Sequence, residues 1–195
     1  MRGLIYRNTA VYRAAMRAIY GGDFIRRYEL VASNIAPGES VLDLCCGDCY
    51  ITRFLDDSCR YEGRDFNEIF IRQAKSKGIS AAFCDIKKGF AQKEKFDCVI
   101  MMGSLHQFIP DEDGVLRQMK AAARRKVLIS EPGRNIVASD NRLVSLAAKV
   151  ISNPGGESVS AIKRFTGKEI AAFFERNGAK RIIDAGKDMI GVFEV

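Results

Sequence analysis

Residues 40–47 carry the strongest structural signal in the sequence, a short apolar segment that runs directly into a turn containing Gly47. An apolar run of about four to eight residues is typical of a strand that is buried on both faces of a parallel sheet. A segment with helical character follows, from about Tyr50 to Leu55. Together they predict a strand, a turn and a helix, which is the repeating unit of an α/β fold.

The same alternation of strand and helix continues along the chain. Four further apolar segments predict strands, and they lie at residues 60–65, 79–84, 96–102 and 126–130. Helical patterns separate the strands, including one that ends at Gly78 and one that begins after Pro110. Five strands that alternate with helices predict a parallel, doubly wound sheet.

The C-terminal residues add two strands of a different kind. Thr166 and Glu169 form a capping box, which predicts a helix that ends at Gly178. Two strand-like segments follow, at residues 180–185 and 189–195, and the short turn between them predicts an antiparallel hairpin. The expected fold class is therefore α/β, with a doubly wound, mostly parallel seven-stranded sheet that this hairpin closes.

Two segments lie outside the alternating pattern. Residues 1–37 predict a helical N-terminal cover, in which four arginines precede the first acidic residue, Asp23. A transit peptide and a helix at a membrane surface are the alternatives for this basic segment. Residues 133–165 are amphipathic at first and then form a Pro-Gly-Gly loop, and we interpret them as an insertion that can act as a substrate lid.

Length and composition favour one domain over residues 1–195. A chain of 195 residues, 47% of them apolar, is too short for two domains of about 100–200 residues each. The net charge of +7 is compatible with nucleic acid, but it is modest and spread along the chain, which favours a solvated basic surface. Six cysteines without a signal-peptide pattern indicate reduced thiols and a cytoplasmic protein. No apolar run reaches the roughly 18 residues of a membrane span.

The turn after the first strand is the predicted ligand site. Open α/β sheets bind ligands in the crevice at the carboxyl ends of their strands, and Gly47 lets a ligand approach the backbone there. Asp65 follows Asp43 by 22 residues and lies at the end of the second strand. An acid at that position can accept hydrogen bonds from ribose hydroxyls. These features predict a ligand that contains a nucleoside.

The dinucleotide-binding pattern G-x-G-x-x-G does not fit this turn. Placed at the turn, the pattern falls on Cys45, Gly47 and Tyr50, so two of its three glycines are missing. A tyrosine in the third position crowds the helix against the strand, and the pyrophosphate loses its close backbone contacts. A nicotinamide-dependent oxidoreductase is therefore the weaker alternative.

Residues 41–49, Val-Leu-Asp-Leu-Cys-Cys-Gly-Asp-Cys, resemble motif I of the class I S-adenosylmethionine-dependent methyltransferases, an acid followed by small-x-Gly-x-small. Three further segments resemble the ends of the second, third and fourth strands of that family, namely residues 63–67, 83–86 and 96–108. The closing hairpin resembles the family's reversed last strand. The resemblance covers residues 38–131 and 165–195, and it implies S-adenosylmethionine as the cofactor.

The resemblance also implies roles for single residues. Gly47 and the backbone of Cys45 would approach the methionine portion, and Asp65 would bind the ribose hydroxyls. The adenine would meet Asp85, with Ile86 packed nearby. The full set of expected cofactor-binding residues is Asp43, Cys45, Gly47, Asp65, Phe66, Asp85, Ile86, Met102 and Gly103, of which the last two would line the floor. Cys45 and Cys49 stand where the family usually has glycine, so a left-handed backbone costs more here.

Methyl transfer is an in-line displacement, so the enzyme mainly aligns the nucleophile with the methyl carbon. A general base is needed only where the nucleophile starts protonated. His106 lies in the loop after the fourth strand and can serve as that base or can fix the loop structure. No catalytic residue and no metal site follow from the sequence.

The sequence favours a small-molecule acceptor that enters between the N-terminal cover and the insertion. The Asn/Asp-Pro-Pro-aromatic segment of enzymes that methylate nucleobase amines is absent after the fourth strand, and no Pro-Cys pair of a cytosine C5 enzyme occurs. A nucleic-acid partner therefore has no supporting motif. An RNA or protein methyltransferase and a non-catalytic cofactor-binding module remain as alternatives, and the sequence does not fix the oligomeric state.

Overall fold

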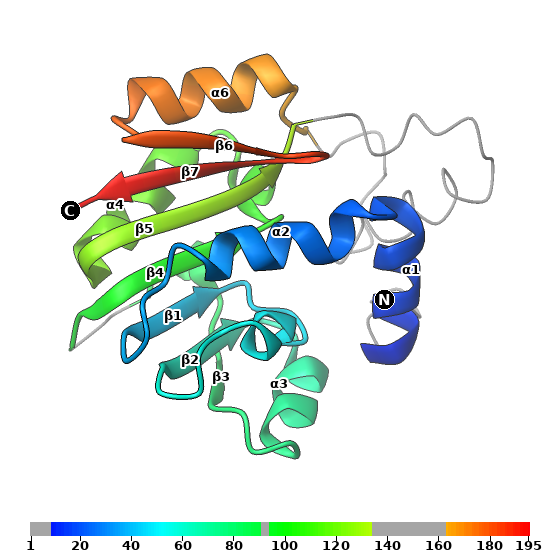
Figure 1. Cartoon of the computed structure of the whole chain (residues 1–195). Helices are drawn as coiled ribbons and strands as arrows, with labels where there is room; N and C mark the ends of the chain where they lie inside the picture. Colours follow the sequence, from blue (N-terminus) through cyan, green and yellow to red (C-terminus); the bar gives the residue numbers. More distant parts are fainter. Residues whose placement is uncertain (1–8, 91–93, 134–162) are drawn as a thin grey trace.

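The computed structural model describes residues 9–90, 94–133 and 163–195 (Figure 1). Its strands form one sheet in the order β3-β2-β1-β4-β5-β7-β6. The strands are β1 Ser40–Leu44, β2 Arg60–Asp65, β3 Ala81–Phe83, β4 Phe96–Met102, β5 Ala123–Pro132, β6 Arg181–Ala185 and β7 Asp188–Glu194. The α-helices are α1 Thr9–Tyr20, α2 Asp23–Ala32, α3 Glu68–Lys75, α4 Glu112–Ala122 and α6 Gly167–Arg176, and three short 3-10 helices are η2 Tyr50–Arg53, η3 Ile86–Lys88 and η4 Leu105–Phe108.

The strand directions confirm the predicted fold class. β1 pairs in parallel with both β2 and β4, and the pairs β2–β3 and β4–β5 are parallel as well. β7 runs antiparallel to both β5 and β6. The chain moves from β1 outward to β3 and then returns to place β4 on the other side of β1. This reversal makes the carboxyl ends of β1 and β4 the expected ligand crevice.

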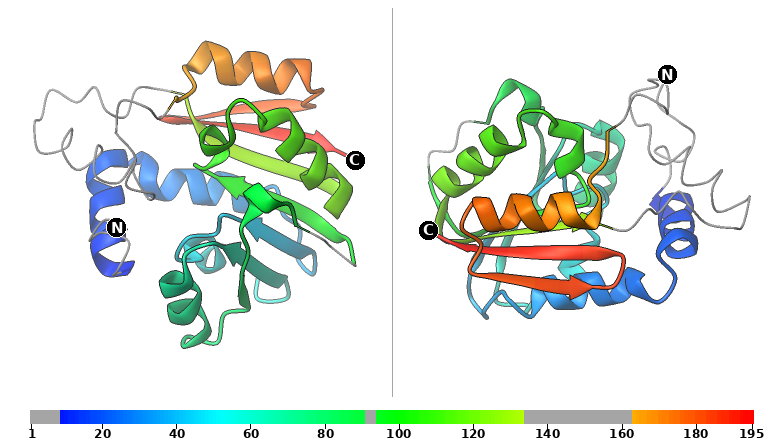
Figure 2. Two further views of the ribbon diagram at one scale, coloured as in Figure 1. Left: turned by 180° about the vertical axis from the view of Figure 1, so that it is seen from behind. Right: turned by 90° about the horizontal axis from the view of Figure 1, so that it is seen from above.

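Alternating side chains of the central strands supply two apolar layers. Val41 packs in a cluster with residues of α1 and α2. Leu42 and Leu44 pack in a second cluster, which contains the buried residues of α4 and α6. The views in Figure 2 show α4 and α6 on one face of the sheet and α2 on the other. Burial on both faces explains why these strands have almost continuously apolar sequences.

The element bounds differ from the sequence predictions in three places. β3 is shorter than residues 79–84, and β5 is longer than residues 126–130. The segment after the first turn is wrong in type, because η2 is a 3-10 helix instead of an α-helix. Its backbone N–H groups bond three residues back, from Thr52 to Cys49 and from Phe54 to Ile51.

The C-terminal helix and hairpin follow the prediction closely. Thr166 and Glu169 form both bonds of the capping box at the start of α6. After α6, Gly178 adopts a left-handed φ of 78°, as expected for a residue that ends a helix. The amphipathic segment expected at residues 139–151, and most of the predicted lid, lie outside the described residues.

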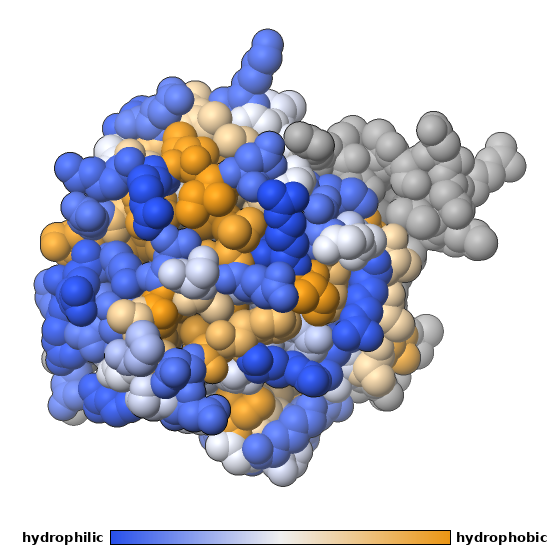
Figure 3. Space-filling view, in the orientation of Figure 1, coloured by the Kyte–Doolittle hydropathy of each residue, from blue (hydrophilic) through white to orange (hydrophobic). Residues whose placement is uncertain are grey.

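The N-terminal cover is helical where the structure describes it. α2 lies along one face of the sheet, and α1 stands beyond the end at which β1 and β4 finish (Figure 1). In the described part of the chain, no helix is long and apolar enough to cross a membrane. The α2 face interleaves hydrophilic and apolar side chains (Figure 3). Large exposed apolar side chains within the described ranges are scattered over α1, β3 and the C-terminus, at Val11, Phe83 and Val195.

Candidate cofactor site at the strand ends

The turn after β1 has the backbone shape of a glycine-rich loop although it contains one glycine. Cys45, Gly47 and Cys49 all adopt left-handed φ values, 58°, 55° and 56°. The N–H of Cys49 donates to the carbonyl of Cys46 at 2.9 Å, which closes the turn. Two cysteines therefore adopt a conformation that favours glycine, at a cost of roughly 1 kcal/mol each.

The sulfurs of this turn are packed beneath it. Sγ of Cys46 lies 3.5 Å from Sγ of Cys49. A Cβ atom at Gly63 of β2 would lie 2.8 Å from the first sulfur and 3.0 Å from the second, so only glycine fits there. The hydrogen bond with Cys49, followed by burial and the charge of Asp43, raises the pKa of Cys46. A thiol that stays protonated is a poor nucleophile, which favours the packing role expected from the sequence.

Asp65, at the end of β2, connects two loops of the site. Its carboxylate accepts a hydrogen bond from the N–H of Gly47 at 2.9 Å and another from the N–H of Asn67 at 2.7 Å. The cap of α3 is formed by Asn67, whose side chain accepts from the N–H of Ile69. Asp65 is therefore not the helix cap that the sequence left as an alternative. Its carboxylate lies beside Gly47, as a ribose-binding acid requires.

Asp43 lies below the turn and is 3% exposed. Its carboxyl group accepts a hydrogen bond from the hydroxyl of Tyr61 at 2.8 Å. Burial raises the pKa of Asp43 to about 8, the Tyr61 bond opposes this, and the nearby Asp65 and Asp48 add to it. Asp43 therefore supports the turn from beneath.

The predicted adenine contacts follow β3. The N–H of Cys84 donates to the carbonyl of Asp65 at 3.0 Å, which brings this strand end beside that of β2. Asp85 accepts from the N–H of Lys87 at 3.2 Å and keeps a side chain that is 34% exposed. Ile86 is buried at 5% exposure. An accessible carboxylate next to an apolar side chain fits an adenine edge.

The end of β4 supplies the predicted floor. Met102 and Gly103 are half-buried, and Gly103 has a left-handed φ of 64°. Its N–H donates to the carbonyl of Ser130 at 2.6 Å. Phe66, the remaining predicted contact, is half-buried between Asp65 and α3. The predicted cofactor residues thus follow the carboxyl ends of β1 to β4.

His106 is paired with a carboxylate that sequence reasoning missed. Its Nδ1 lies 2.6 Å from Oε1 of Glu131, near the end of β5. The other oxygen of Glu131 accepts from the N–H of Leu105 at 2.8 Å. Both side chains are buried, at 7% for His106 and 1% for Glu131. Because the two residues are 25 positions apart, only the pairing of β4 with β5 reveals this dyad.

Helix α1 reaches across the site from one side to the other. Arg13 forms an ion pair with Asp48 of the turn after β1, and its guanidinium lies 4.9 Å from the ring centroid of Tyr50. At the other side, the ring of Tyr12 lies 5.3 Å from that of Phe70 in α3. α1 therefore contacts both elements that flank Asp65.

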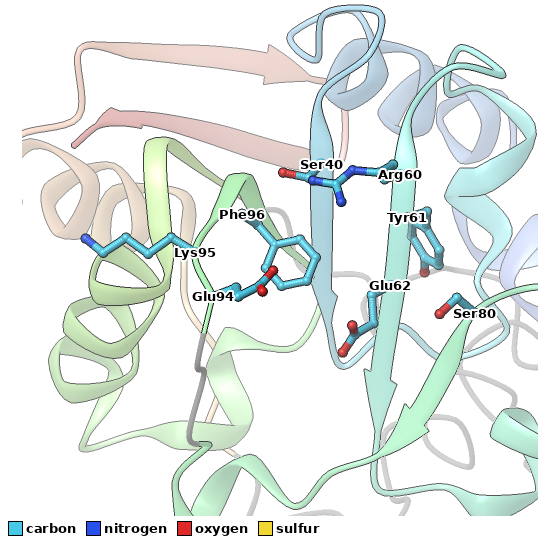
Figure 4. A pocket seen from close by; sticks show the side chains of 8 residues that line it. All are labelled: Ser40, Arg60, Tyr61, Glu62, Ser80, Glu94, Lys95 and Phe96. Carbon is cyan, nitrogen blue, oxygen red and sulfur yellow. The ribbon is translucent and has the colours of Figure 1, made fainter.

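A surface hollow of about 340 Å³ lies at the opposite edge of the sheet (Figure 4). Arg60 and Glu62 of β2 and Glu94 and Lys95 before β4 line it, together with the ring of Phe96. The hollow is at the amino ends of β1 and β4, whereas the predicted cofactor residues follow the carboxyl ends. It is therefore separate from the candidate cofactor site.

Sequence comparison places a known domain on this part of the chain. Residues 41–126 match the profile of a family described as methyltransferase domain. The matched residues include the turn after β1 and the ends of β2, β3 and β4. No curated protein matches the chain in sequence.

Solved structures share the fold at low identity. The magnesium protoporphyrin IX methyltransferase of Synechocystis PCC 6803 with bound SAH has a TM-score of 0.61 at 17% identity, over 94% of each chain. The protein of a DhpI-SAM-HEP complex has a TM-score of 0.60 at 16% identity, over 98% of each chain. A Rhodobacter sphaeroides structure described among Zn-dependent alcohol dehydrogenases also has a TM-score of 0.61, at 14% identity, over 91% of this chain and 95% of that one.

The sheet order, the reversed β7 and the matched domain define the class of this protein. It has the Rossmann-like fold of the class I S-adenosylmethionine-dependent methyltransferases. More particularly, the chain contains a methyltransferase domain at residues 41–126.

Proposed function

We propose that this protein transfers the methyl group of S-adenosylmethionine to a small-molecule acceptor. The observation that carries the proposal is the position of Asp65. Its carboxylate lies at the end of β2 and bonds the N–H of Gly47 in the turn after β1. A buried acid beside a left-handed, open turn suits a nucleoside whose ribose hydroxyls donate to the carboxylate.

We infer that the other predicted residues bind the rest of the cofactor. Gly47 and the backbone of Cys45 would face the methionine portion, and Met102 with Gly103 would lie beneath it. Asp85 would accept from the adenine amino group, with Ile86 and Phe66 against the base. Asp43 would act indirectly, because Tyr61 already donates to its carboxyl group.

The His106–Glu131 dyad gives the site a group that can accept a proton. Glu131 binds Nδ1 of His106, which leaves Nε2 as the ring atom for an acceptor. A base at this position matters for a hydroxyl or an ammonium, which must lose a proton before or as the methyl carbon is attacked. We therefore infer that the acceptor presents one of these two groups.

The arrangement of α1 favours a small acceptor over a macromolecule. α1 contacts both the turn after β1 and α3, so it encloses the cofactor mouth. The magnesium protoporphyrin IX methyltransferase with the same fold is named for a small-molecule acceptor. An RNA or protein methyltransferase would instead need an open basic face around the mouth.

The proposal is tested by calorimetric titration of S-adenosylhomocysteine into the parent protein and into Asp65→Asn. We expect the substitution to weaken binding at least tenfold, because an amide accepts the ribose hydroxyls less well than a carboxylate. Asp97→Asn is the matched control, since Asp97 also accepts hydrogen bonds from a backbone N–H and a hydroxyl, both of Ser40, but at the opposite edge of the sheet. Equal affinity in Asp65→Asn and the parent would contradict the ribose assignment.

A further inference from the structure

Arg27 and Asp188 form a buried ion pair that no part of the cofactor assignment uses. Arg27 lies on α2 and is 3% exposed, and Asp188 begins β7 and is fully buried. Nη1 of the arginine is 3.5 Å from Oδ2 of the aspartate. The guanidinium lies 4.2 Å from the ring centroid of Tyr20 and 4.8 Å from that of Tyr28. Aromatic rings thus fix the arginine in place.

Several polar atoms of this pair have no hydrogen-bond partner. Nη2 of Arg27 donates to the hydroxyl of Tyr28 at 3.0 Å, and Oδ2 of Asp188 accepts from Ser130 at 2.8 Å. Within the described residues, Nε and Nη1 of Arg27 and Oδ1 of Asp188 make no hydrogen bond. Buried donors and acceptors are almost always paired, so two free donors beside a free acceptor indicate a missing polar partner.

The pair lies next to the predicted floor of the cofactor site. A Cβ atom on Gly103 would be 3.8 Å from Nη1 of Arg27. Gly103 also bonds Ser130, the same residue whose hydroxyl donates to Asp188. The unpaired atoms are therefore close to where the methionine portion is expected to end.

We propose that Arg27 and Asp188 bind an α-amino-acid head group, with the guanidinium on its carboxylate and Asp188 on its ammonium. The charges favour a zwitterion, since a lone anion would face Asp188 and Glu131, which lie near each other, and a lone cation would face Arg27. The inference rests on the proposed function in one respect. The methionine end of the cofactor is the source that the position beside Gly103 favours, and an amino-acid acceptor would offer the same chemistry.

The test compares two nucleosides on the full chain. S-adenosylhomocysteine carries the head group, whereas 5′-methylthioadenosine lacks it. We expect Arg27→Met and Asp188→Asn each to weaken S-adenosylhomocysteine at least tenfold and to change 5′-methylthioadenosine less than twofold. Retained binding of the shorter nucleoside also shows that the variant is folded. Arg26→Met, an exposed neighbour on the same helix, should leave both affinities unchanged.

A second arm identifies the source of the head group. Saturation-transfer NMR with glycine is recorded on the parent protein loaded with S-adenosylhomocysteine and on both variants. Unchanged nucleoside affinities together with a glycine signal that both variants lose would assign the pair to an acceptor. Unchanged affinities without such a signal would overturn the proposal. A parent protein that binds neither nucleoside would instead refute the proposed function, and the glycine arm would still test the pair.

Discussion

Single residues show where sequence patterns and backbone shape diverge. The positions of Cys45 and Cys49 in a glycine-like turn could be predicted from their match to motif I. Their left-handed conformation could not, because cysteine ordinarily avoids positive φ. The structure accounts for Cys49 through its packing, since its sulfur fills the space above Gly63 beside Cys46. Glu131 and Asp188 were missed for another reason, because their partners lie far away in sequence.

Asp43 makes stability depend on pH in a direction that can be measured. Its pKa is about 8 in the folded protein and ordinarily 3.8, so the folded state binds one more proton between these values. The unfolded state is therefore favoured as the pH rises from about 4 to 8. We expect Asp43→Asn to gain roughly 2–4 kcal/mol in unfolding free energy, relative to the parent, between pH 5 and pH 8.

Denaturant unfolding at the two pH values measures this gain. Asp97→Asn is the control, because the hydrogen bonds from Ser40 lower the pKa of Asp97 and it stays ionised over this range. Its stability difference from the parent should be the same at both pH values. A difference for Asp43→Asn that is also independent of pH would refute the shifted titration.

At the scale of elements, α1 depends on few contacts with the site that it covers. The sequence indicated a helical cover from its arginines and apolar spacing, but not which loop the arginines would meet. Arg13 pairs with Asp48, and Nη2 of Arg17 donates to the hydroxyl of Tyr50 at 3.2 Å. These contacts connect α1 to the turn after β1, and the glycines at 21 and 22 separate it from α2.

We expect Arg13→Met to release α1 without unfolding the sheet. Loss of the ion pair leaves Asp48 without its arginine, while the apolar contacts of Met16 and Ile19 remain. Hydrogen exchange should accelerate at least tenfold in residues 9–20 and stay unchanged in β4 and β5. Arg26→Met is the control, because this exposed residue lies on α2, away from Asp48. Unchanged exchange in α1 would show that the pair does not fasten the helix.

At the scale of the molecule, the order of the sheet explains how much could be predicted. Each parallel strand is a local apolar run, so β1, β2 and β4 were predicted at or near their final bounds. The short β3 and the long β5 were less accurate, because strand ends are set by pairing with neighbours. The cofactor residues could be predicted because they directly follow strands. The acceptor side could not, since α1, α2, η4 and the ends of β5 and β7 contribute to it together.

The central claim is that this fold binds the nucleoside of S-adenosylmethionine and not a dinucleotide. Calorimetric titration of the parent protein with S-adenosylhomocysteine, and separately with NADH, tests it most directly. We predict one S-adenosylhomocysteine bound per chain and no heat of binding from NADH, because two of the three glycines of the dinucleotide pattern are missing. Binding of NADH without S-adenosylhomocysteine, or of neither, would contradict the account.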